Sequence, residues 1–126
     1  MVRKKSKLIL KGQIALITGG GKGLSLGIAK CFAASGAKVI LVGRRKVELK
    51  KDYKLLERNA LPLTGDVTDL EMIPALVDRA EKLSGPVTVL VNNAGIHLKK
   101  AALETFVAEF AAVLQTHGFG AFALTR

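Results

Sequence analysis

The sequence predicts an α/β fold built on a doubly wound parallel sheet. Short apolar runs alternate with helical patterns along 126 residues, and continuous apolar runs are typical of strands that are buried on both faces. Right-handed crossovers between such strands place helices on both faces of one sheet. Glycine-rich or asparagine-rich turns follow three of the predicted strands. We expect about four strands in the order 3-2-1-4, within one domain over residues 11–126.

Each element is predicted from its pattern and its boundary signals. The predicted strands are residues 14–18, 38–42, 60–63 and 87–91. The predicted helices are residues 24–34, 45–58, 70–83 and a last helix from about residue 105 to the end. Gly36 ends the first helix, and Asp69 is a candidate N-cap for the third. Gly118 and Gly120 are defects in the last helix, because each glycine costs roughly 1 kcal/mol relative to alanine in a helix interior.

The net charge of +10 is concentrated in a basic N-terminal tip, residues 1–10, and in residues 43–58. A solvated tail and helix face explain this excess better than nucleic-acid binding, because aromatic residues are few and form no stacking platform. No apolar run approaches the roughly 20 residues that cross a bilayer, so we expect no membrane association. The single cysteine, Cys31, is expected to be a buried apolar residue, which fits a reducing, cytoplasmic location.

Three loops have the chemistry of a nucleotide site. Between the first strand and the first helix, glycines allow the backbone to approach a diphosphate, and the helix N-terminus directs N–H groups toward the anion. Gly65-Asp66-Val67 and Asn92-Asn93-Ala94-Gly95 follow two other strands. Because the carboxyl ends of parallel strands meet at one edge of the sheet, the three loops predict a common site there.

The motifs Thr18-Gly19-x-x-x-Gly23-Leu24, Asp66-Val67 and Asn92-Asn93-Ala94-Gly95 resemble those of the classical short-chain dehydrogenase/reductase family. The resemblance runs over residues 11–126 and implies a Rossmann-type sheet that binds NAD or NADP. It implies that glycines of the first loop approach the pyrophosphate, that Asp66 bonds the adenine amino group, and that the third loop lies along the ribose. The expected cofactor-binding residues are Thr18, Gly19, Gly21, Lys22, Gly23, Leu24, Arg44, Arg45, Asp66, Val67, Asn92, Ala94 and Gly95.

The end of the second predicted strand indicates which cofactor is preferred. An acidic residue there would bond the ribose hydroxyls of NAD and repel a 2′-phosphate. This sequence instead has Arg44 and Arg45, and Lys22 offers a further cation. Arginine pairs well with phosphate, so we expect NADP, with NAD as the alternative. The other interpretation of Arg44 and Arg45 is that they open a solvated basic helix.

Two positions depart from the family pattern. Ser25 stands where the family has a third glycine; its side chain would either push the first helix outward or bond to the helix start or the diphosphate. His117 stands at the position of the family's structural asparagine. Three roles remain open for it: a catalytic histidine, a helix-kink or proton-relay residue, and an ordinary helix residue.

The catalytic serine, tyrosine and lysine of the family lie in a region that this sequence does not reach. The only tyrosine, Tyr53, falls in the second predicted helix. We therefore expect a truncated cofactor-binding half of an NAD(P)-dependent oxidoreductase, which meets a small carbonyl or alcohol substrate only when a second chain completes it. The alternatives are a non-catalytic dinucleotide-binding or partner-binding module and an inert fragment. The exposed edge of the fourth strand predicts self-association or a partner chain, and no metal site is expected.

Overall fold

The computed structural model describes residues 8–20, 23–56 and 59–126. The strands of this part of the chain form one four-stranded sheet in the order β3-β2-β1-β4, with all neighbours parallel. The strands are β1 Ile14–Thr18, β2 Lys38–Gly43, β3 Ala60–Thr64 and β4 Val89–Val91. The predicted Rossmann-type topology and strand order are therefore confirmed.

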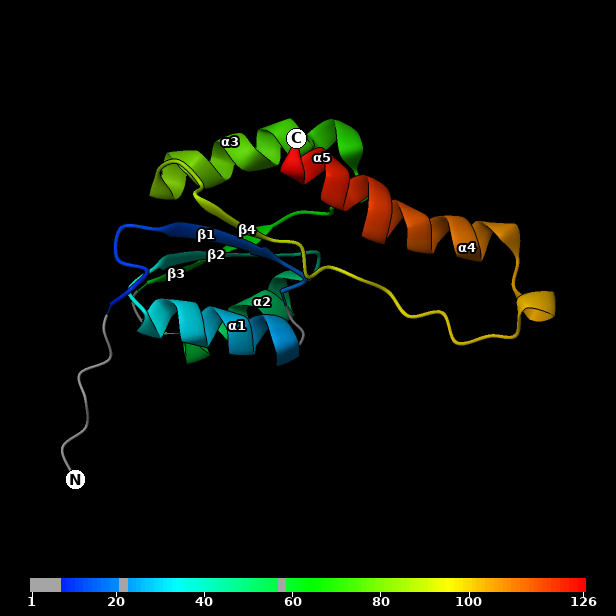
Figure 1. Ribbon diagram of the computed structural model, residues 1–126, viewed down its shortest axis with the longest axis horizontal. Coiled ribbons are helices and arrows are strands. Elements are labelled where there is room, and N and C mark those ends of the chain that lie inside the picture. Colours follow the sequence, from blue (N-terminus) through cyan, green and yellow to red (C-terminus); the bar gives the residue numbers. More distant parts are fainter. Residues whose placement is uncertain (1–7, 21–22, 57–58) are drawn as a thin grey trace, which may run out of the picture.

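The sheet is covered by helices on both faces (Figure 1). Helices α1 (Gly23–Ala34) and α2 (Lys46–Leu55) lie on one face, and α3 (Ile73–Ser84) and the C-terminal helices lie on the other. Because successive side chains of a strand point to opposite faces, β1 contributes Ile17 to the core under α1 and α2, and Leu16 to the core under α3.

Two local predictions about the helices are wrong. Cys31 is exposed on α1 and does not enter either core. Asp69 precedes a 3-10 helix, η1 (Leu70–Met72), and its side chain makes no capping bond with the described residues. By contrast, α1 ends as predicted, because Gly36 adopts a φ of 96° that side chains rarely tolerate.

The last helical segment is not uniform. A 3-10 turn, η2 (Ala102–Glu104), precedes α4 (Val107–Leu114), which continues into the π-helix η3 (Gln115–Gly120) and then into α5 (Ala121–Thr125). The two predicted glycine defects both fall in η3. A Cβ on Gly120 would lie 2.5 Å from the carbonyl oxygen of Val67, so this glycine allows the helix to pass directly against the loop after β3.

The continuous helix Val107–Thr125 is long and apolar enough to cross a membrane by length and composition alone. The sequence analysis looked for an unbroken apolar run of roughly 20 residues and did not single out this segment. Core helices of soluble proteins meet the same criterion, and this helix packs on the α/β domain through Gly120 and through the bond from Gln115 Nε2 to the Thr68 carbonyl oxygen (3.3 Å). We interpret it as a covering helix whose outer face is exposed.

Candidate functional site

A cavity of about 170 Å³ opens at the carboxyl ends of the strands. Its walls come from the loops after all four strands, from the start of α2, and from the π-helix η3. The lining residues are Gly19, Gly20, Val42, Gly43, Arg44, Arg45, Glu48, Gly65, Asp66, Val67, Thr68, Ala94, Gly95, Ile96 and Thr116. The cavity therefore lies where the loops after the first, third and fourth strands were predicted to meet.

The floor of the cavity is main chain. The N–H of Gly20 donates to the carbonyl of Val42 (2.7 Å), and the N–H of Gly65 donates to the carbonyl of Gly43 (3.0 Å). A Cβ on Gly43 would lie only 2.7 Å from the carbonyl oxygen of Gly20. Side chains are excluded here because the backbones at the ends of neighbouring strands pass so close together. A ligand on this floor would meet peptide groups.

Thr18, the last residue of β1, connects the first loop to the third. Its Oγ1 accepts hydrogen bonds from the backbone N–H groups of Asn93 (3.0 Å) and Ala94 (2.9 Å), and it donates to the carbonyl of Val91 (3.4 Å). The side chain is buried. Gly19 follows with a φ of 78°, and a Cβ there would lie 2.9 Å from Asn93 Nδ2. Thr18 therefore holds the end of β1 and the loop after β4 together beside the cavity.

Asp66 is held at the edge of the cavity by an Asx turn. Its Oδ1 accepts hydrogen bonds from the N–H (2.9 Å) and from Oγ1 (2.7 Å) of Thr68. These bonds fix the carboxylate while leaving Oδ2 without a hydrogen bond to any described residue. Val67, next to it, is buried. The arrangement offers an acceptor beside an apolar side chain, which is the chemistry that an amino-substituted heterocycle requires.

Two arginines line the rim of the cavity, at the end of β2 and the start of α2. Arg45 is the N-cap of α2, and its Nη1 lies 2.9 Å from Glu48 Oε1. Arg44 makes no ion pair within the described part of the chain. The sequence interpretation treated the two arginines alike and did not consider Glu48, although its spacing of three residues from Arg45 on a helix was a readable signal.

His117 does not line the cavity but packs behind its wall. Its Nε2 lies 3.1 Å from the backbone nitrogen of Ile96 and 3.0 Å from the carbonyl oxygen of the same residue. The ring also covers Gly95, where a Cβ would lie 2.6 Å from His117 Cε1. The neighbouring Thr116, also in η3, lines the cavity directly. No sequence pattern indicated Thr116, because its placement depends on the π-helix.

The structure places some of the predicted site residues in the cavity lining and others outside it. Asn92 lies outside the lining, and its Nδ2 donates to Thr125 Oγ1 (3.2 Å). Gly23 and Leu24 form the first turn of α1 and are not part of the lining, while the predicted Gly21 and Lys22 lie outside the described residues. The predicted residues that do line the cavity are Gly19, Arg44, Arg45, Asp66, Val67, Ala94 and Gly95.

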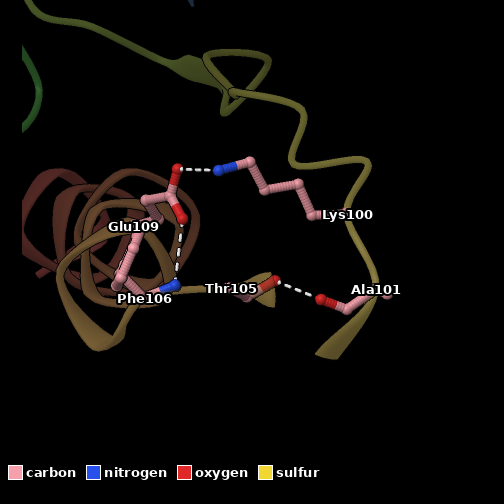
Figure 2. A network of polar contacts seen from close by, with 5 residues as sticks. All are labelled: Lys100, Ala101, Thr105, Phe106 and Glu109. Atoms are coloured by element: carbon pink, nitrogen blue, oxygen red, sulfur yellow. Dashed lines mark hydrogen bonds and ion pairs between the residues drawn. The ribbon is translucent and has the colours of Figure 1, made fainter. Parts of the chain in front are cut away.

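A separate polar cluster fastens the loop before α4 (Figure 2). Glu109 Oε1 lies 2.6 Å from Lys100 Nζ, and Oε2 accepts a hydrogen bond from the N–H of Phe106 (3.0 Å). The Lys100 ammonium also lies 5.7 Å from the centre of the Phe106 ring. The bond from Lys100, followed by that from the Phe106 N–H, holds the pKa of the Glu109 carboxyl below its ordinary value of 4.5.

With this geometry established, comparison with known proteins identifies the family. The family model described as short chain dehydrogenase matches residues 13–126. The chain belongs to the short-chain dehydrogenase/reductase family. It is 39% identical to a galactitol 2-dehydrogenase (L-tagatose-forming) of Cereibacter sphaeroides, over 93% of this chain and 46% of the relative. It is 36% identical to an NADP-dependent (R)-specific alcohol dehydrogenase of Lentilactobacillus kefiri, over 93% and 47%.

A solved structure extends the likeness to three dimensions. A 3-ketoacyl-(acyl-carrier-protein) reductase from Brucella melitensis, complexed with NADH, superposes with a TM-score of 0.87 and 36% identity over 93% of this chain and 48% of that chain. The chain thus spans less than half the length of these family members. The residues matched by the family model, 13–126, include every described residue that lines the cavity.

Proposed function

We propose that this chain is the dinucleotide-binding half of an oxidoreductase that prefers NADP to NAD. The observation that carries the proposal is the cavity at the carboxyl ends of β1 to β4, with a main-chain floor and with cations on one rim. Arginine side chains favour phosphate. The position directly after β2, where an acid would favour NAD, is occupied by Arg44.

The lining residues fit a dinucleotide in chemical character. Gly19 and Gly20 offer backbone that a pyrophosphate can approach closely, since neither carries a Cβ. Asp66, fixed by Thr68, would accept a hydrogen bond from the adenine amino group, with Val67 beside the ring. When bound, the nicotinamide supplies or accepts a hydride at a small carbonyl or alcohol substrate.

This chain alone is proposed to bind the cofactor without turning over a substrate. Its only tyrosine, Tyr53, lies in α2 and does not line the cavity. General acid–base catalysis contributes typically about 10²- to 10⁴-fold, and the lining formed by the described residues contains no histidine, lysine, cysteine or tyrosine. A partner that completes the catalytic half, and a cytoplasmic location, remain predictions.

Calorimetric titration of the purified chain with NADPH and NADH tests the proposal. We expect NADPH to bind more tightly, by up to about 1 kcal/mol, the upper end for an exposed ion pair. Arg44→Asp should reverse the order, while Arg79→Asp, an equal change of charge on α3 outside the cavity lining, should preserve it. Equal affinities in the parent chain contradict the NADP assignment, and turnover of a carbonyl substrate contradicts the proposed division between binding and catalysis.

A further inference from the structure

Arg44 and Arg45, the two arginines at the rim, differ because Arg45 forms an ion pair with Glu48. Both partners line the cavity, and the Nη1–Oε1 distance of 2.9 Å makes the pair a direct charge-assisted contact. Arg44 lines the same cavity without such a partner among the described residues. The two arginines are adjacent in sequence, yet among the described residues only Arg45 has an acidic partner.

The position of Glu48 favours persistence of this pair. Glu48 lies in the first turn of α2, where the helix macrodipole stabilises a carboxylate. Its side chain is also less exposed than that of Arg45, at 43% against 73%. A negative charge is therefore kept at the rim whether or not Arg45 stays in contact with it. Any anion that approaches Arg45 must compete with this carboxylate or be repelled by it.

We propose that Glu48 is a selectivity-determining residue that weakens recognition of a 2′-phosphate at this rim, while Arg44 supplies the main cationic contact. The inference rests on the proposed function, since it concerns the adenosine ribose of the same cofactor. The proposal predicts that the parent chain prefers NADP over NAD by less than it would if both Arg44 and Arg45 were unpaired. Glu48 acts on selectivity by binding alone and has no part in catalysis.

The effect of Glu48 on 2′-phosphate recognition is measured with two nucleotide fragments. Adenosine 2′,5′-bisphosphate carries the 2′-phosphate, and 5′-AMP lacks it. Their dissociation constants are measured by calorimetry at low ionic strength, where screening is weakest. Glu48→Gln should raise the affinity ratio of bisphosphate to 5′-AMP by about two- to fivefold, the equivalent of one exposed ion pair. The matched control Glu104→Gln, with the same change of charge in η2, should leave the ratio unchanged.

A double-mutant cycle separates local pairing from a general gain of positive charge. Arg45→Gln should weaken bisphosphate binding, because it leaves the Glu48 carboxylate unpaired at the rim. Adding Glu48→Gln to Arg45→Gln should restore the affinity to at least the parent value. Arg44→Gln should weaken bisphosphate binding relative to the parent chain, whereas Arg45→Gln/Glu48→Gln should not. Circular dichroism of each variant verifies that it is folded.

The outcomes distinguish the two proposals. If the parent chain binds neither fragment, the proposed function fails, and the inference fails with it. If the parent binds both fragments but Glu48→Gln changes the ratio no more than Glu104→Gln does, the inference alone is overturned. A lower ratio in Glu48→Gln would also overturn it, because it would show that the carboxylate assists 2′-phosphate binding.

Discussion

The Oγ1 atom of Thr18 lies 2.9 Å from the backbone nitrogen of Ala94, and the bond between them joins β1 to the loop after β4 across 76 positions of sequence. The same oxygen accepts the N–H of Asn93. A single buried hydroxyl therefore satisfies two consecutive peptide donors, and it does so directly behind the cavity.

Thr18→Val keeps the shape of the side chain but removes the acceptor from both N–H groups. We predict a loss of about 1–3 kcal/mol in the free energy of unfolding, the usual cost of leaving buried donors unpaired. Urea unfolding followed by circular dichroism measures it. Thr18→Ser retains the hydroxyl and should cost less than Thr18→Val; the reverse order would show that packing of the methyl group matters more than the bonds.

Gly95 and His117 should show strong coupling in stability. Because a Cβ on Gly95 would lie 2.6 Å from His117 Cε1, Gly95→Ala should destabilise the chain by about 1–3 kcal/mol through overpacking. In a His117→Ala background the ring is absent, so the same substitution should cost less than half as much. Thermal unfolding of the four proteins of the cycle gives the coupling, and simple additivity would contradict the packing between these residues.

Glu109 should titrate below its ordinary pKa of 4.5. A carboxyl with a lowered pKa in the folded state adds stability that is fully present above its unfolded pKa and is lost as pH falls through the folded pKa. The stability difference between the parent and Glu109→Gln should therefore be constant near pH 7 and shrink below about pH 4.5.

Carboxyl carbon chemical shifts in a pH titration measure the Glu109 pKa directly. Lys100→Gln removes the first cause of the shift and should move the pKa upward toward its ordinary value, leaving the contribution of the Phe106 N–H. The control Lys99→Gln changes the same charge one residue earlier and should move it less. An unshifted pKa in the parent chain would show that the cluster of Figure 2 is not formed in solution.

The exposed apolar face of Val107–Thr125 should cause self-association. Phe119 and Phe122, three residues apart on this helix, are each more than half exposed, and large apolar side chains exposed together mark contact surfaces. We predict that the mass measured by light scattering rises with concentration, and that Phe119→Gln/Phe122→Gln lowers it. A monomer mass at every concentration contradicts this prediction, and an unchanged mass in the double variant would indicate the β4 edge instead.

The sheet could be predicted closely from sequence because strands buried on both faces give continuous apolar runs. The predicted 14–18 strand matches β1, and the predicted 38–42 strand differs from β2 only by Gly43. The last strand was predicted two residues too early, at 87 instead of Val89. Val87 is apolar and β-branched like the strand, but its backbone N–H donates to the side chain of Glu81, and no one-dimensional pattern contains that information.

The candidate site was predictable where it depends on local motifs and not where it depends on distant packing. Gly19, Asp66 and Gly95 lie in loops that the sequence indicated, and all three line the cavity. Thr116 lines the cavity from η3, and propensity scales do not distinguish such a π-helix from a glycine defect. Cys31 was wrongly placed because residue type indicates burial only on average, while its position on α1 faces away from the sheet.

Because the backbones of Gly20 and Gly43 pass so close together, the floor and the rim of the cavity differ in how readily mutation can change them. A side chain on Gly43 would clash with the carbonyl oxygen of Gly20, so the main-chain floor tolerates little change. Arg44, Arg45 and Glu48 at the rim can each be exchanged singly. Under the proposed function, substitution at the rim would therefore change which nucleotide is preferred, while the floor stays the same.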